Sequence, residues 1–191
     1  MIVLLSLPRT GSESYYNEHI ARPNPGWVHL HELVSWVAID REPTLKVLTT
    51  NPKSSVKIFP WFECADHKKY IMTIIEHADE IIYNLRGDFE AQCKSFMLST
   101  LTQHWSNHRV EREIDLDTLD ENEYRQHSMK LLGELLEAEI IYKRFPGKVA
   151  LLESREQKPY NDPFIYKGSW PNIDDIVQQF EAFKSSSQLF N

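Results

Sequence analysis

Cysteine is scarce in this chain of 191 residues, which contains only Cys64 and Cys93. Two cysteines cannot build a disulfide framework, so we expect a reducing compartment, by default the cytoplasm. Long apolar runs are also missing. The apolar opening Ile2–Leu5 is far shorter than the ~18 residues of a membrane-spanning helix, and it lacks the basic flank and cleavage site of a secretory signal. We expect it to belong to the fold, and we expect no membrane span.

An excess of positive charge is absent as well. The chain has 21 basic and 28 acidic residues, a net charge of −7, which argues against nonspecific nucleic-acid binding. Ten acidic and three basic residues lie within 111–139, so this segment carries the whole imbalance. We interpret the acidic run as a solvated helix face. Because surface charges are screened beyond a Debye length, it does not oppose an anion site elsewhere.

Internal repeats, low-complexity tracts and linkers are missing too, and we expect one domain over residues 1–191. Five Trp, nine Phe and eight Tyr exclude wholesale disorder. Short apolar runs alternate with helical patterns, which predicts an α/β fold of three layers, a mostly parallel sheet flanked by helices. We expect strands at 2–7, 56–59, 80–85 and 149–152, and helices at 12–21, 30–39, 66–77, 89–104, 119–143 and 171–183.

Two of these helices carry clear side-chain patterns. Asp88 is a good N-cap for the helix that follows it. Apolar residues spaced three and four apart mark the expected buried stripe of that helix, from Phe89 through Cys93 and Met97 to Leu101. A second stripe, over 119–143, is formed by Met129, Leu132, Leu136 and Ile140.

The sharpest local feature is the turn Leu7–Ser14 between the first strand and the next helix. A tight turn with a glycine can point several backbone N–H groups at one spot, and the helix dipole adds about half a positive charge there. Arg9 would supply a fixed charge to a bound phosphate or sulfate. An ordinary strand-to-helix turn explains the same residues equally well. The G-x-x-x-x-G-K-[ST] pattern of common ATPases and GTPases is absent.

Two segments resemble the P-loop sulfotransferases, which use 3′-phosphoadenosine 5′-phosphosulfate (PAPS). Pro8–Ser12 is similar to the family's 5′-phosphosulfate loop. Ile81–Asp88, continuing to Gln92 and Ser95, resembles the family's strand, loop and helix that bind the 3′-phosphate. The pattern R-x-D-x-x-x-Q-x-x-S is nearest the bacterial and phage branch, and this chain fits it at each position.

The resemblance implies a P-loop fold and a set of site residues. Donor-binding residues would be Arg9, Thr10, Gly11, Ser12, Glu13, Ser14, Arg86, Ser95, Lys167 and Gly168. Glu32 falls where this branch carries its general base, and His29 and His31 are alternatives that composition alone does not separate. Glu13 departs from the Ser or Thr usual in the family, and its carboxylate would either face solvent or weaken anion binding.

The implied activity is transfer of a sulfuryl group from PAPS to a hydroxyl acceptor, such as a small molecule or carbohydrate, with release of 3′,5′-ADP (PAP). Arg9 would also act in catalysis, and no metal is required. A small P-loop kinase and an inactive nucleotide-binding relative remain alternatives. Elsewhere, His104 and His108 have the spacing of a helical metal pair without supporting ligands. We expect Lys57, at the end of a strand, to be solvated.

Overall fold

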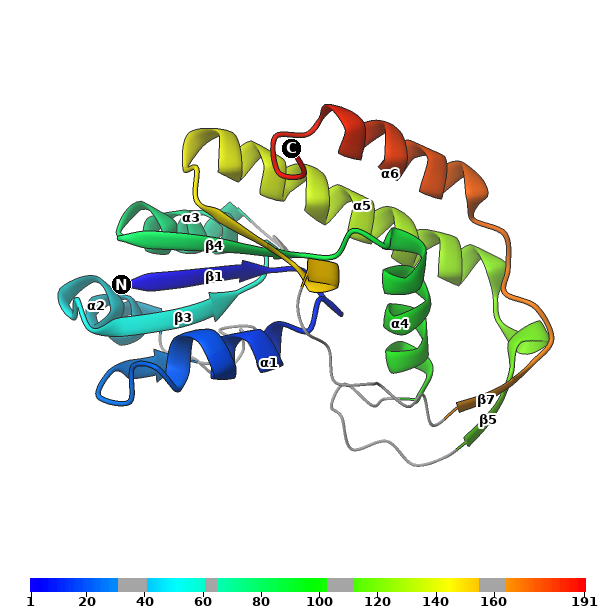
Figure 1. The fold of residues 1–191 in the computed structure, drawn as a ribbon, viewed down its shortest axis with the longest axis horizontal. Coiled ribbons are helices and arrows are strands. Elements are labelled where there is room, and N and C mark those ends of the chain that lie inside the picture. The colour runs from blue at the N-terminus through cyan, green and yellow to red at the C-terminus, as the bar shows by residue number, and fades with distance from the viewer. Residues whose placement is uncertain (31–40, 61–64, 103–111, 155–163) are drawn as a thin grey trace.

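The structure is a computed structural model that describes residues 1–30, 41–60, 65–102, 112–154 and 164–191 (Figure 1). Its main sheet has five parallel strands in the order β2-β3-β1-β4-β6. The strands are β1 (Ile2–Ser6), β2 (Val28–Leu30), β3 (Ser54–Ile58), β4 (Glu80–Leu85) and β6 (Lys148–Leu151). The predicted α/β fold with a central parallel sheet is therefore confirmed.

Helices occupy most of the remaining described residues. They are α1 (Ser12–Tyr15) with its π-helical continuation η1 (Tyr16–Ala21), α2 (Arg41–Thr50), α3 (Ala65–Glu76), α4 (Phe89–Thr102), α5 (Glu121–Arg144) and α6 (Asp174–Ser186). A separate parallel pair joins β5 (Arg112–Asp115) to β7 (Phe164–Lys167), and two 3-10 turns are η2 (Leu116–Thr118) and η3 (Leu152–Ser154). Helix α2 and strands β2, β5 and β7 were not expected from the sequence. Of the helix expected at 30–39, Leu30 lies in β2 and the rest falls outside the described residues.

The two faces of the main sheet have different covers, because successive side chains of a strand point to opposite faces. Leu4 and Ile82 pack against Tyr16 and Ile20 of η1. The opposite face, which includes Val3, packs with helices α2 to α6 into the larger core. Accordingly, α1 lies on one side of the sheet, and α5 and α6 lie on the other (Figure 1).

Helix α5 packs differently from the sequence expectation. Met129, Leu136 and Ile140 are 48, 45 and 60% exposed, and only Leu132 of the expected stripe is buried. The core instead receives a neighbouring stripe, made of Tyr124, Leu131, Leu132, Leu135, Ala138 and Ile141. Both stripes have helical spacing, so periodicity alone does not choose between them. Leu101 of α4, also expected inside, is exposed.

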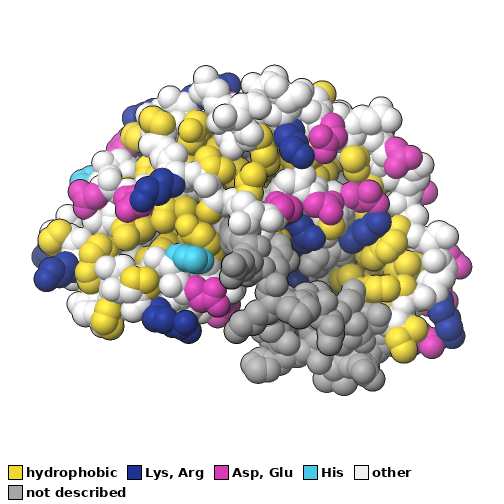
Figure 2. All heavy atoms as spheres, viewed as in Figure 1, with side chains coloured by type: hydrophobic (Ala, Val, Ile, Leu, Met, Phe, Trp, Pro, Cys, Tyr) yellow, Lys and Arg dark blue, Asp and Glu magenta, His cyan; other side chains and the backbone are white. Residues whose placement is uncertain are grey.

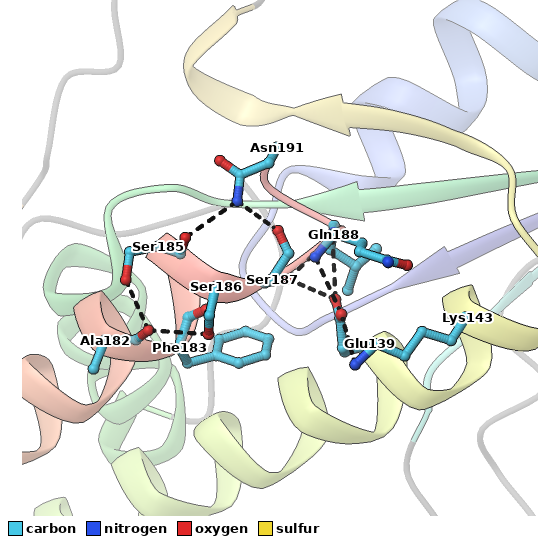
Figure 3. A network of polar contacts seen from close by, with 10 residues as sticks. Glu139, Lys143, Ala182, Phe183, Ser185, Ser186, Ser187, Gln188 and Asn191 are labelled. Atoms are coloured by element: carbon cyan, nitrogen blue, oxygen red, sulfur yellow. Dashed lines mark hydrogen bonds and ion pairs between the residues drawn. The ribbon is translucent and has the colours of Figure 1, made fainter.

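The acidic run is not simply a solvated face, because Glu134 and Glu139 of α5 are buried. Burial raises the pKa of Glu134 to about 7. Glu139 instead holds the segment after α6 (Figure 3). Its carboxylate accepts hydrogen bonds from Ser187 Oγ at 2.5 Å and from the backbone N–H groups of Gln188 and Leu189 at 3.1 Å each. It also forms an ion pair with Lys143 at 3.2 Å. Burial opposes ionisation of Glu139, but these donors outweigh it and lower its pKa.

We expect Glu139→Gln to destabilise the fold by about 1–3 kcal/mol at pH 7, because the amide cannot accept all of these bonds. A lowered folded-state pKa contributes stability above the unfolded value of about 4.3, and this contribution is lost as pH falls through the folded pKa. Urea denaturation should therefore show a smaller difference from wild type at pH 3. Glu137→Gln, which breaks the exposed pair with Lys68, is the matched control and should cost under ~1 kcal/mol. Equal losses in both variants would contradict this role of Glu139.

Candidate functional site

The strand order reverses between β1 and β4, so their carboxyl ends form a topological switch point. The chain leaves β1 toward β2 at one edge of the sheet and leaves β4 toward β6 at the other. Adjacent parallel strands whose connections diverge in this way leave a crevice where α/β proteins bind ligands. The turn after β1 and the turn Arg86–Asp88 after β4 both lie at this edge, since Ser6 pairs with Asn84.

A buried network of polar side chains connects the turn after β1 to strands β1 and β4. Asn84 Nδ2 donates to Ser6 Oγ at 2.9 Å and to Thr10 Oγ1 at 2.5 Å, and the two hydroxyls lie 2.8 Å apart. Thr10 Oγ1 also donates to the carbonyl of Leu7 at 2.8 Å. Ser6, Thr10 and Asn84 are fully buried, so their bonds are costly to break. Thr10 was expected at the site from the sequence, whereas no role was expected for Ser6 or Asn84.

Helix α4 holds the same turn from the side. Gln92 Nε2 donates to the carbonyl of Pro8 at 2.7 Å, and Arg9 Nε donates to Ser95 Oγ at 2.9 Å. The two segments that resemble the sulfotransferases therefore meet in space, through Arg9 and Ser95, which are 86 positions apart in the sequence. Arg9 itself has a φ of 64°, a left-handed conformation that costs a non-glycine residue about 1–2 kcal/mol. These contacts keep Arg9 in that conformation.

Helix α1 begins at this turn with its first N–H groups uncapped by side chains. Gly11 is the N-cap, with a φ of 64° and no side-chain bond to the helix. Ser12, Glu13 and Ser14 form the first turn, whose N–H groups have no acceptor within the helix. Glu13 is exposed, which is the solvent-facing alternative for its carboxylate. An anion in front of Gly11 could accept several of these N–H groups.

The backbone of the turn after β4 is bound by a carboxylate from another part of the chain. Glu153, in η3, accepts hydrogen bonds from Gly87 N at 2.8 Å and Asp88 N at 3.1 Å, and its Oε1 lies 3.9 Å from Arg86 Nε. Asp88 caps α4 through a bond from Ala91 N at 2.9 Å, as predicted. Acidic and basic side chains lie next to one another over the beginning of α4 (Figure 2). The hydroxyl of Ser95 contacts Arg9, and no described contact joins Ser95 to Arg86.

His29 is held at the opposite end of the sheet. Its strand register places it level with Ser55 and Ile2, about 13 Å of strand before Ser6. Its Nε2 lies 2.8 Å from the carbonyl of Asn24, so in the neutral ring Nδ1 accepts from Ser55 Oγ at 2.7 Å. Both nitrogens thus have partners, and the structure does not bring His29 to Arg9. The alternatives Glu32 and His31 lie outside the described residues.

Lys167 is the last residue of β7 in the small sheet, and Gly168 follows it. Lys167 Nζ pairs with Glu113 of β5 at 2.6 Å. Gly168 has a φ of 79°, a left-handed conformation that favours glycine, and a Cβ there would lie 2.4 Å from Asp117 Oδ1. Among the described contacts, none joins Lys167 or Gly168 to the candidate-site residues Arg9, Arg86 or Ser95.

Lys57 is only 1% exposed, so the expectation that it is solvated is wrong. It lies on β3 beside β1, paired in register with Leu4, and its Nζ is 5.8 Å from the centre of the Phe59 ring. All five residues of β3 are buried, so the ammonium group is enclosed by the fold. A single strand-end lysine carries no sequence signal for such burial. Lys57 therefore carries its ammonium group inside the fold, on the strand next to β1, which leads into the candidate loop.

Comparisons with known proteins add no family assignment. No protein-family model matches the chain, and no curated protein or solved structure matches it significantly. Within the described part of the chain, no helix is long and apolar enough to cross a membrane. The same residues contain no group of three His, Cys, Asp or Glu side chains placed to hold a metal ion, and His104 and His108 lie outside them.

The strain at Arg9 can be measured by comparing two substitutions. Arg9→Ala and Arg9→Gly both remove the bond to Ser95, but only glycine adopts a φ of 64° without steric cost. We therefore expect Arg9→Gly to be more stable than Arg9→Ala by about 1 kcal/mol in urea denaturation, despite the greater chain entropy of unfolded glycine. The reverse order would show that residue 9 does not adopt this conformation in solution.

Proposed function

We propose that this protein is a sulfotransferase that moves a sulfuryl group from PAPS to a hydroxyl acceptor. The observation that carries the proposal is the bond between Arg9 and Ser95, which joins the two segments that resemble the donor-binding segments of the family. The switch point between β1 and β4 supports it, because both segments lie at the edge where α/β folds bind nucleotides.

The donor's two phosphate groups have separate partners in this proposal. The N–H groups at Gly11–Ser14 hold the 5′-phosphosulfate, with the positive end of the helix dipole behind them. Arg86 and Ser95 hold the 3′-phosphate, and Lys167 and Gly168 belong to the segment that closes on it. The buried network of Ser6, Thr10 and Asn84 keeps the loop rigid while the anion binds.

The transfer forms a bond from the acceptor oxygen to sulfur and breaks the bond from sulfur to the bridging oxygen of PAPS. Negative charge moves to the phosphate of the leaving PAP, and a base takes the acceptor's proton. Arg9 offsets the charge on the bridging oxygen, and Lys57 adds a second positive charge on the neighbouring strand. Glu32 is the proposed base, since both nitrogens of His29 are held elsewhere.

A nucleotide-binding protein without transferase activity is the second candidate. The observation that favours it is that no contact in the described part of the chain joins Ser95 to Arg86, although both are assigned to the 3′-phosphate. Such a protein would bind PAP and PAPS without turnover. A small kinase has less support, because the G-x-x-x-x-G-K-[ST] loop is absent.

Donor recognition can be tested with a thermal shift assay. We expect PAP to raise the melting temperature more than ADP at equal concentration, because only PAP carries a 3′-phosphate for Arg86. A ligand at 100 times its Kd stabilises by about 2.7 kcal/mol. Arg86→Ala should remove the difference, whereas Arg125→Ala, which breaks the exposed pair with Asp175 of α6, should preserve it. Equal responses of the wild type to PAP and ADP would refute the donor assignment.

Catalysis is tested by the release of PAP from PAPS across a panel of hydroxyl acceptors. Arg9→Ala should lower turnover far more than it weakens PAP binding, since its charge matters most as the leaving phosphate gains charge. Arg9→Lys should recover much of the rate by restoring the charge. Normal turnover by Arg9→Ala would show that the loop is misassigned. PAP binding by the wild type without turnover of any acceptor would favour the inactive relative.

A further inference from the structure

The turn Arg86–Asp88 is held from both sides by residues far along the chain. The N–H of Gly87 donates to Glu153 Oε2 at 2.8 Å, and its carbonyl accepts from Lys184 Nζ of α6 at 3.1 Å. The N–H of Asp88 donates to Glu153 Oε1 at 3.1 Å. The backbone of this turn is therefore fixed by two side chains, one from η3 and one from α6.

The side chain of Arg86 faces the same carboxylate. Its Nε is buried without a hydrogen-bond partner in the described part of the chain, and the nearest charge partner is Glu153 Oε1 at 3.9 Å. A guanidinium has five N–H donors in a planar fork. One guanidinium can therefore face a carboxylate with its Nε and a second anion with its terminal NH₂ groups.

We propose that Glu153 is a positioning residue that orients Arg86 toward the donor's 3′-phosphate. This inference rests on the proposed function and extends it, since it assigns the preference for a 3′-phosphorylated nucleotide to Glu153. That residue ends the segment Val149–Glu153, which resembles the family's late strand less specifically than Pro8–Ser12 and Ile81–Ser95 resemble their counterparts. Glu153 bonds the turn and faces Nε, so it acts through Arg86 without touching the nucleotide. Lys184 holds the other side of Gly87 through the carbonyl of that residue.

The test measures the Kd values of PAP and ADP by calorimetry for the wild type and for Glu153→Gln. Gln keeps the size of the side chain but removes the charge that faces Arg86. We expect PAP binding to weaken by about tenfold, as for loss of one charge-assisted contact, while ADP binding changes less than about twofold. Glu76→Gln is the matched control, because Glu76 pairs with Arg144 at 2.9 Å on the surface and should leave both Kd values unchanged.

A double variant separates positioning from simple structural support. Arg86→Ala with Glu153→Gln should lose no more PAP preference than Arg86→Ala alone, because both changes remove the same contact. Additive losses, or equal weakening of PAP and ADP by Glu153→Gln, would overturn the proposal. Tighter PAP binding by Glu153→Gln would also overturn it, since the carboxylate would then compete with the phosphate.

The proposed function and this inference fail in different ways. A wild type that does not prefer PAP over ADP refutes the donor assignment itself. A wild type that prefers PAP, with the preference intact in Glu153→Gln, refutes only the role of Glu153. Should Glu153→Gln not fold, Lys184→Met releases the same turn through the carbonyl of Gly87. It should reduce the preference for PAP by about twofold to fivefold, as for a partial weakening of one contact, and an unchanged preference would count against the inference.

Discussion

The requirement that buried polar groups be paired governs the edge of the sheet where the candidate site lies. Ser6 and Asn84 are neighbours on β1 and β4, and both are buried with Thr10 of the following turn. Because each must satisfy its hydrogen bonds inside the protein, they join the two strands and the turn into one rigid unit. The left-handed backbone of Arg9 lies between this unit and α4, whose Gln92 donates to the carbonyl of the preceding residue, Pro8.

The carboxylates described above differ in whether they accept hydrogen bonds from the backbone. Glu139 and Glu153 both accept backbone N–H groups of a distant segment, so they act as internal anions that hold the chain together. Glu134 is buried without comparable donors, and burial raises its pKa to about 7. Two of the acidic residues counted in the net charge of −7 therefore lie inside the fold and not on its surface.

Much of the fold could be predicted because long apolar strands and capped helices carry local signals. The expected strand at 80–85 matches β4, and Asp88 caps α4 as expected. Strands β2, β5 and β7 have only three or four residues, and tertiary pairing decides them. The buried stripe of α5 and the burial of Lys57 also depend on packing partners that periodicity does not contain. Sequence resemblance placed Arg9 and Ser95 in one site, but no local pattern connects Glu153 to Arg86 across 67 positions.

The order of strands has a consequence for how the chain folds. Ile2 of the central strand pairs with Ser55 of β3 and with Glu80 of β4, so each partner of β1 is more than 50 residues away. No two neighbouring strands of the main sheet can form a hairpin, because all the described pairs are parallel. Sheets built from such distant contacts close slowly. Because β1 is apolar and its partners are distant in the sequence, we expect this strand to be prone to aggregation until the sheet has formed.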